Sequence, residues 1–214
     1  MKMELERVAP MEIEARSFEL IERELPHPLN PALAPIIKRV IHTTADFDYA
    51  DSLCFVHDAV SAGLAALREG AVIVTDTTMA QAGINKRALS KLGGETRCFI
   101  SDPAVAEAAR NMGVTRSSAA VDLAARIDDR PLIFAVGNAP TALARLYELI
   151  VAGKVSPRLV IGVPVGFVNV VQSKEMILSA PVPAIVARGR KGGSNVAAAI
   201  CNALLYMLVG REQA

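Results

Sequence analysis

Apolar residues in the first third of the chain recur at helical spacing. After Asn30-Pro31, an N-cap residue followed by a proline suited to the first helical position, they recur every three or four residues and predict a helix with one apolar face. This helix should end near His42, where two threonines meet an acid-rich turn. A more polar helix is predicted before it, over Glu12–Glu24, and a third helix after it. The apolar positions are Leu33, Ile36, Ile37, Val40 and Ile41 in the helix after Pro31, and Leu53, Val56, Val60, Leu64 and Leu67 in the third helix.

From Gly70 onward the pattern changes to short apolar runs separated by segments of helix length. Runs of four or five residues rich in β-branched side chains and bounded by Gly, Pro or Asp are typical of parallel strands joined by helices. The sequence therefore predicts an α/β protein. We expect a single doubly wound domain over residues 1–214, with a five-stranded parallel sheet, N-terminal helices and poor order in residues 1–10. The predicted strands are Val72–Thr75, Arg97–Ile100, Leu132–Val136, Leu159–Val163 and Ala184–Ala187.

Composition and charge favour one fold class and argue against some kinds of partner. The 52% hydrophobic and 4% aromatic content suits helices packed on a buried sheet. A net charge of +1 argues against binding to nucleic acid or to a membrane surface. The longest apolar run, Val196–Val209, is too short to cross a bilayer, and no signal peptide is visible. Cys54, Cys98 and Cys201 are far apart in the sequence and are expected to be buried, reduced thiols of a cytoplasmic protein.

The predicted strands run out into loops of small and polar residues. Ligands of open α/β sheets bind outside the carboxyl ends of the strands, where such loops let a ligand approach helix N-termini. Ordinary turn and capping chemistry is the alternative for any one loop, but five on one edge favour a binding site. The loops are Thr75–Thr78, Ser101–Pro103, Gly137–Pro140, Val163–Gly166 and Gly189–Asn195.

His42 is the leading candidate for proton chemistry. Arg39 lies one turn earlier on the same helix face, and a nearby cation tends to keep an imidazole neutral near pH 7. A histidine that merely complements the helix C-terminus is the alternative. His27 and His57 are expected to be surface or structural residues, and the three histidines do not have the spacing of a metal site. The acidic residues after His42, namely Asp46, Asp48 and Asp51, could suggest Mg²⁺ but are more typical of helix capping.

Several basic clusters could meet an anionic ligand. The Arg188–Asn195 loop combines three cations and three glycines before a helix, although it is neither a P-loop nor a dinucleotide fingerprint. Lys86-Arg87 and Arg116-Ser117 are shorter clusters. Any one of them could be a solvated basic spot, but several at the strand ends would suit a ligand with many carboxylates.

Long ordered motifs resemble the precorrin-8X methylmutase family over about residues 14–208. The central one is Ile37–Asp48, whose run from His42 to Phe47 resembles the branch of the family with cobalt-containing substrates more closely than the cobalt-free branch. The chain departs from the family pattern at Asn169, Val170, Val171 and Gln172. The other matching motifs are Thr75–Met79, Gly83–Arg87, Thr115–Ser117, Gly137–Ala142, Val163–Phe167 and Gly189–Ser194.

This resemblance implies a flavodoxin-like fold, a homodimer with the active site near its interface, and no cofactor. The implied reaction is a 1,5-sigmatropic methyl shift from carbon 11 to carbon 12 of a corrin precursor, with any cobalt belonging to the substrate. The catalytic histidine of the family corresponds to His42. Substrate contacts are expected from Ser17, Arg39, Thr43, Thr77, Lys86, Arg116, Ser117, Asn138, Arg188, Lys191, Gly192, Gly193 and Ser194, with no metal held by the protein.

Two other classes of function remain open. A non-catalytic corrinoid carrier on the same fold would use the motif D-x-H-x-x-G, and none of the three histidines has Asp two residues before it and Gly three after it. A nucleotide-binding oxidoreductase would show a Gly-rich fingerprint, which the sequence lacks.

Overall fold

The computed structural model describes residues 6–10 and 12–210. Of residues 1–10, for which we expected poor order, residues 1–5 lie outside the described part. That expectation and the assignment of residues 1–214 to one domain stay predictions.

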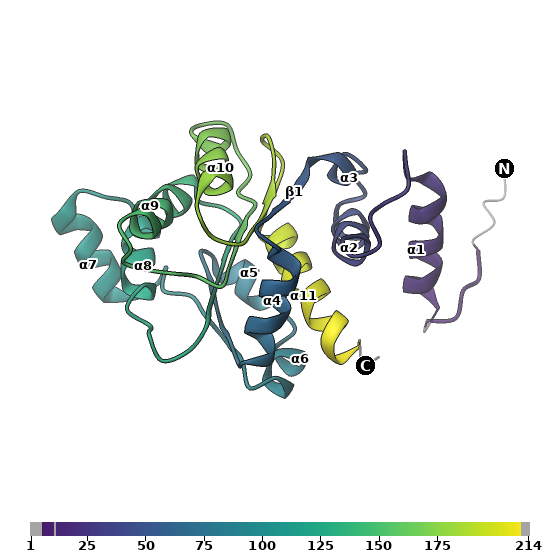
Figure 1. Ribbon diagram of the computed structural model, residues 1–214, viewed down its shortest axis with the longest axis horizontal. Coiled ribbons are helices and arrows are strands. Elements are labelled where there is room, and N and C mark those ends of the chain that lie inside the picture. Colours follow the sequence, from purple (N-terminus) through teal and green to yellow (C-terminus); the bar gives the residue numbers. More distant parts are fainter. Residues whose placement is uncertain (1–5, 11, 211–214) are drawn as a thin grey trace.

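The described residues form an α/β fold around one mixed sheet of six strands (Figure 1). The strand order is β1-β6-β5-β4-β2-β3. Strands β2 to β6 pair in parallel, whereas β1 pairs antiparallel with β6, Leu53 lying opposite Ala187. The strands are β1 (Leu53–Val56), β2 (Val72–Thr75), β3 (Glu95–Arg97), β4 (Leu132–Val136), β5 (Leu159–Gly162) and β6 (Ala184–Ala187).

The predicted five-stranded, all-parallel sheet is therefore wrong in its number of strands and in the direction of one edge strand. The segment Leu53–Val56 was assigned to the third helix, but it is strand β1. His57 and Asp58 have positive φ angles of 53° and 52°, which separate β1 from the helix that begins at Ala59. His57 was placed on that helix and lies instead in the turn before it.

Two element boundaries also differ from the predictions. The helix expected from Pro31 begins at Ala34, because Asn30 accepts a hydrogen bond from the backbone of Ala32 and the intervening residues form a turn. Strand β3 ends at Arg97, where the predicted strand began.

Two hydrophobic layers cover the two faces of the sheet. Alternating strand residues contribute to each, with Ile73 and Ile133 on one face and Val72 and Phe134 on the other. The first face packs against α2 (Ala34–Thr44), α4 (Ala59–Arg68), α5 (Thr78–Gly83), α6 (Lys86–Lys91) and α11 (Ser194–Val209). Helix α1 (Ile13–Glu24) packs on the outside of α2, and the short α3 (Tyr49–Ser52) follows α2. The second face packs against α8 (Arg116–Ala124), α9 (Pro140–Val151) and α10 (Val170–Ser179), and α7 (Pro103–Met112) packs on α8.

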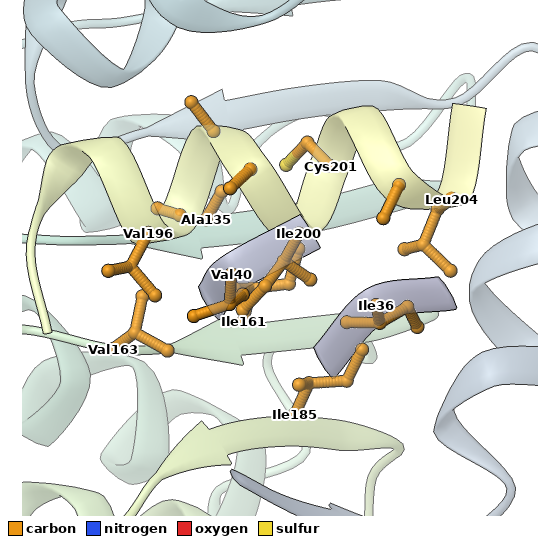
Figure 2. Close-up of a cluster of buried hydrophobic side chains, with 14 of the residues drawn as sticks. Ile36, Val40, Ala135, Ile161, Val163, Ile185, Val196, Ile200, Cys201 and Leu204 are labelled. Atoms are coloured by element: carbon orange, nitrogen blue, oxygen red, sulfur yellow. The ribbon is translucent and has the colours of Figure 1, made fainter. Parts of the chain in front are cut away.

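Helix α11 is the centre of the first layer, and its packing sets the position of α2. Val196, Ile200 and Leu204 are fully buried, or nearly so, along its length. Figure 2 shows Val40 of α2 beside Ile200, and Ile36 nearer to Leu204, so the two packed helices run in opposite directions. The C-terminal end of α2 therefore lies near the N-terminal end of α11, beside the carboxyl ends of the parallel strands.

The three cysteines are free thiols, but only Cys201 is fully buried. Cys54 and Cys98 are partly exposed, so the expectation of burial is wrong for these two. In the described part of the chain, no helix is both long and apolar enough to cross a membrane.

Candidate active site

His42 lies in the last turn of α2, which ends when Ala45 adopts a left-handed conformation. The Phe18 ring of α1 meets the imidazole edge to face, with ring centroids 5.5 Å apart. Partial burial, and to a smaller extent the charge of Arg39, lower the pKa of His42 below its usual value. An imidazole that is mainly neutral near pH 7 and still reachable from solvent can give or take a proton.

Arg39 connects α2 with α1 and α11. Its guanidinium lies 4.9 Å from the centroid of the Phe18 ring and 5.1 Å from that of Tyr206, and it pairs with Glu14. The side chain is only 14% exposed, and this burial lowers the pKa of Arg39. A mostly buried guanidinium that keeps some exposure is able to meet a carboxylate.

Ser17 and Thr43, the two hydroxyl groups expected beside this histidine, are occupied locally. The Ser17 hydroxyl donates to the carbonyl of Ile13, and that of Thr43 donates to the carbonyl of Arg39. Both hydroxyls keep acceptor capacity for a ligand. Ser17 lies on α1, one residue before Phe18, whose ring touches His42.

A second group of predicted residues lies where the strand order reverses, between β2 and β4. Asp76, which directly follows β2, accepts hydrogen bonds from the backbone N–H groups of Gly137, Asn138 and Ala139 after β4. Burial raises the pKa of Asp76, and these three donors oppose that effect. The carboxylate thereby fixes the loop that presents the exposed side chain of Asn138.

Thr77 and Ser194 join β2 to the start of α11. Their hydroxyl oxygens are 2.8 Å apart, and the Thr77 hydroxyl also caps α5 by accepting from the N–H of Ala80. Gly137 makes this approach possible, because a Cβ on it would lie 2.7 Å from the Cα of Ser194. The site therefore depends on loops from β2, β4 and β6 that are in close contact.

Gly192 and Gly193, expected to cradle an anion, pack against the end of β5. The N–H of Gly193 donates to the carbonyl of Val163. A Cβ on Gly192 would lie 2.1 Å from the same carbonyl oxygen, so no side chain fits there. Close packing of two loops accounts for Gly192, whether or not a ligand also approaches the backbone.

Lys191 links the two groups of residues. Its ammonium lies 2.7 Å from a carboxylate oxygen of Asp46 and 2.5 Å from one of Asp48, both on the segment that follows α2. The pairing raises the pKa of Lys191 and lowers that of Asp46. Asp46 and Asp48 thus bind a lysine, and within the described residues no group of three or more His, Cys, Asp or Glu side chains is arranged for a metal ion.

The remaining predicted contacts are more dispersed. Lys86 is exposed at the start of α6. The preceding residue, Asn85, forms hydrogen bonds with Asn202 and Tyr206 of α11, and Tyr206 also contacts Arg39. Arg188 forms a two-point ion pair with Glu175, so binding a ligand would require it to exchange partners.

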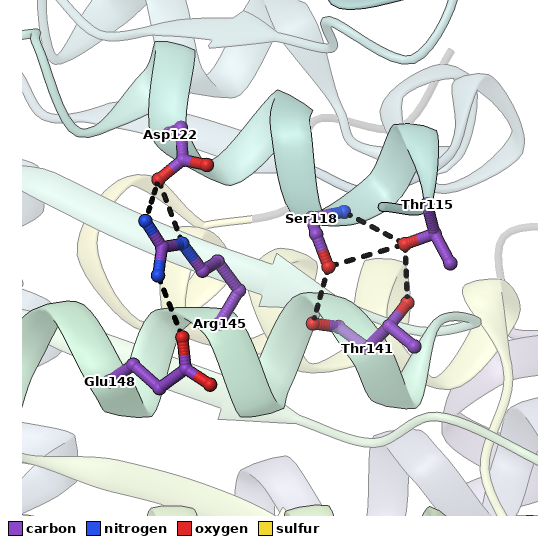
Figure 3. Close-up of polar contacts among 6 residues, drawn as sticks. All are labelled: Thr115, Ser118, Asp122, Thr141, Arg145 and Glu148. Atoms are coloured by element: carbon purple, nitrogen blue, oxygen red, sulfur yellow. Dashed lines mark hydrogen bonds and ion pairs between the residues drawn. The ribbon is translucent and has the colours of Figure 1, made fainter. Parts of the chain in front are cut away.

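Arg116 and Ser117 begin α8 beside the N-terminus of α9. Thr115 and Ser118 bond to Thr141 there, as Figure 3 shows. Farther along the same two helices, Arg145 of α9 forms ion pairs with Asp122 and Glu148. Because α9 directly follows the Asn138 loop, these contacts place Arg116 and Ser117 at the same edge of the sheet.

His27 lies at the surface, where it pairs with Asp51 at 2.7 Å, which agrees with the expectation of a surface or structural residue. Sequence reasoning missed Asp76 and Lys174 as organisers of the loops. Lys174 could have been found, because Val170, Lys174 and Ile177 form the buried stripe of α10, and a lysine within such a stripe is unusual.

The fold and these residues define the class: an α/β enzyme whose candidate site lies at the carboxyl edge of its sheet, with a histidine of lowered pKa close to Arg39. The sequence profile of the precorrin-8X methylmutases matches residues 12–207. The chain belongs to the precorrin-8X methylmutase family. It is an isomerase of cobalamin biosynthesis that catalyses an intramolecular methyl shift.

Individual relatives agree over nearly the whole chain. The chain is 52% identical to the cobalt-precorrin-8 methylmutase of Salmonella typhimurium over 93% of this chain and 96% of the relative. Identity is 40% to the precorrin-8X methylmutase of Pseudomonas aeruginosa, over 88% and 91% of the two chains. The solved structure of the precorrin-8X methylmutase of Thermus thermophilus superimposes with a TM-score of 0.82 at 42% identity, covering 92% of this chain and 96% of that one.

Proposed function

We propose that the protein converts cobalt-precorrin-8 to the corresponding cobyrinate by moving a methyl group from carbon 11 to carbon 12. Relatives named cobalt-precorrin-8 methylmutases, at 52% and 46% identity, support the cobalt-containing substrate. In this reaction the bond from carbon 11 to the methyl group breaks as the bond to carbon 12 forms, with no net gain or loss of electrons. The cobalt ion is part of the substrate.

His42 supplies a proton or a hydrogen bond to the macrocycle. A suprafacial 1,5-shift is thermally allowed, so the protein has only to select one tautomer or protonation state of the ring and to orient it. One well-placed proton donor or hydrogen-bond partner is sufficient for this, and the reaction requires no cofactor. The observation that carries the proposal is the position of His42, partly buried against Phe18 and close to Arg39 at the end of α2.

The acetate and propionate arms of the ring bind the cations and donors around this histidine. Arg39 and Ser17 meet the arms on the α1 side, and Lys86 lies on that side too. Lys191, Ser194 and Asn138 meet them at the strand ends, together with the start of α8 at Arg116. Bidentate binding of carboxylates by arginine gives the strongest of these contacts.

The test is a spectroscopic assay of cobalt-precorrin-8 with the protein and with the variant His42→Asn. Asparagine keeps the approximate shape and one hydrogen bond but does not titrate. We expect the wild type to change the spectrum to that of the product, and the variant to turn over about 10²–10⁴-fold more slowly while still binding the ring. Turnover of His42→Asn within a fewfold of wild type would remove His42 from the mechanism.

The same assay separates the enzyme from a corrinoid carrier, the alternative class. A carrier would shift the spectrum on binding without forming product. Thermal unfolding of His42→Asn provides the control, because a histidine that only complements the helix end would lower stability by about 1 kcal/mol and leave turnover unchanged.

We expect the active unit to be a cytoplasmic homodimer with the site near its interface. Two features support an interface. Helix α1 lies at the end of the molecule and packs mainly on α2 (Figure 1). Large apolar side chains are exposed after β5 and in α5: Phe167 is 80% exposed, Val168 78% and Met79 70%. Sedimentation at assay concentration should give a dimer; a fully active monomer would contradict the proposal.

A further inference from the structure

Lys174 of α10 is a fully buried cation, with 0% of its surface exposed. Its ammonium donates hydrogen bonds to the carbonyl of Gly189 at 2.8 Å and to that of Lys191 at 2.7 Å. Among the residues that the structure describes, no carboxylate forms an ion pair with it. The acidic residue next in the chain, Glu175, pairs with Arg188 instead.

Such a group is costly to bury. An ammonium taken out of water without a counter-ion is destabilised, and removal from water lowers the pKa of Lys174 to about 8. An apolar side chain of similar length would fill the space without that cost. The position therefore contributes something other than the stability of α10.

The two carbonyls show what Lys174 contributes. They belong to the loop that leaves β6, where Gly189 has a φ angle of 81° and the chain turns toward α11. The backbone of this loop forms two further hydrogen bonds: the N–H of Gly193 donates to the carbonyl of Val163, and the N–H of Gly166 donates to the carbonyl of Arg190. Lys174 is thus a direct side-chain link between the buried layer and the middle of the loop.

This loop orients the groups that are proposed to bind the substrate. Lys191 extends from it to Asp46 and Asp48, four and six residues after His42. Ser194 follows it and bonds to Thr77 at 2.8 Å. Gly192, between Lys191 and Ser194, packs closely against the carbonyl of Val163. If the Lys191 carbonyl were displaced, the Lys191 side chain and the Ser194 hydroxyl would therefore move with it.

We propose that Lys174 is a positioning residue for substrate binding, which acts by fixing the Gly189–Lys191 loop through two carbonyl oxygens. The inference rests on the proposed function, in which this loop meets the carboxylate arms of the ring. Lys174 does not touch the substrate. Its effect is on binding of the arms rather than on the methyl shift itself.

The test compares Lys174→Met, which has similar length and no donor, with Lys174→Gln, which keeps two N–H donors on a shorter side chain. Lys154→Met is the control, because it makes the same chemical change at an exposed lysine after α9. We expect Lys174→Met to raise KM for cobalt-precorrin-8 about tenfold or more with kcat within about threefold of wild type, because loosened positioning weakens binding. Lys174→Gln should recover part of the loss, and Lys154→Met should match wild type.

Amide hydrogen exchange without substrate tests the loop separately from the reaction. Exchange at residues 189–193 should become faster in Lys174→Met than in wild type or Lys154→Met, while exchange in β4 and β5 stays slow. Wild-type KM and wild-type exchange in Lys174→Met would overturn the proposal. Loss of folded protein with unchanged KM in the folded fraction would also overturn it, and Lys174→Gln provides the same comparison if the Met variant does not fold. Absence of turnover in the wild type would instead refute the proposed function, and the exchange experiment would still decide the role of Lys174 in the loop.

Discussion

The ring of Phe18 faces the imidazole of His42 edge on, and the same ring lies 4.9 Å from the guanidinium of Arg39. One aromatic side chain of α1 therefore contacts both residues of α2 that are expected to act on the substrate. It also contributes to the burial that lowers the pKa of His42.

Removing this ring should raise the pKa of His42. In Phe18→Ala water reaches the imidazole, so the main cause of the lowered pKa is reduced and the value moves up toward 6.5. NMR titration of the histidine ring protons measures the shift directly. If His42 titrates in the rate-limiting step, the corresponding limb of the kcat profile should move to higher pH by the same amount. Phe18→Leu, which keeps most of the burial, is the control; an unchanged pKa in Phe18→Ala would show that the ring does not control His42.

Arg39→Ala should weaken substrate binding by about 1.5–3 kcal/mol, which is the range for a hydrogen bond to a charged group. Spectroscopic titration of the ring under conditions without turnover gives the dissociation constant. Because Arg39 pairs with Glu14, the variant Glu14→Gln separates the two effects. It removes that ion pair and keeps the guanidinium, so we expect a smaller change. An unchanged dissociation constant in Arg39→Ala would count against direct contact with substrate.

Gly137→Ala should disturb the contact between Thr77 and Ser194. The added Cβ would lie 2.7 Å from the Cα of Ser194 and 2.8 Å from the carbonyl of Gly193, so the loop backbone has to move. Overpacking of this kind costs about 1–3 kcal/mol of stability, and KM should rise as well. The comparison is Ser194→Ala, which loses one hydroxyl without moving the loops and should cost about 0.5–1.5 kcal/mol. A Gly137→Ala protein with wild-type stability and KM would show that the loops tolerate separation.

The strands that are buried on both faces of the sheet could be predicted from the sequence. β4 was predicted with its exact bounds and β5 to within one residue, because Leu132–Val136 and Leu159–Gly162 are continuous apolar runs. β1 was missed because Leu53 and Val56 also fit a helical spacing, and what makes the segment a strand is pairing with β6, more than a hundred residues away in the chain. Local pattern contains no information about that pairing.

The candidate site was predicted in outline and not in its internal contacts. The carboxyl edge of the sheet was the expected location, and the structure brings Thr77, Asn138 and Ser194 together there. The contact of Lys191 with Asp46 joins residues 145 positions apart, which no spacing rule can detect. Asp76 was predicted only as part of a strand-end loop at a binding site, and the bonds of its carboxylate to three N–H groups of another loop were not foreseen.

Lys174 gives the protein a distinctive dependence of stability on pH. Its pKa is about 8 in the folded protein against 10.5 for an unperturbed lysine. Between these values the unfolded chain binds more protons than the folded chain, so the free energy of unfolding increases as the pH rises. From pH 8 to pH 9 the gain is at most about 1 kcal/mol. Burial raises the pKa of Cys201 to about 12 from 9.0, which acts in the opposite direction above pH 9.

Urea unfolding at pH 8 and at pH 9 measures this contribution. We expect wild type and Lys154→Met to gain stability over that interval relative to Lys174→Met, in which the titrating group is absent. At pH 7 the Met variant loses the cost of a buried charge but leaves the carbonyls of Gly189 and Lys191 without this donor. The change in free energy of unfolding between pH 8 and pH 9, and not the stability at one pH, is therefore the quantity to compare. If Lys174→Met shows the same increase in free energy of unfolding from pH 8 to pH 9 as wild type, a group other than Lys174 produces that increase.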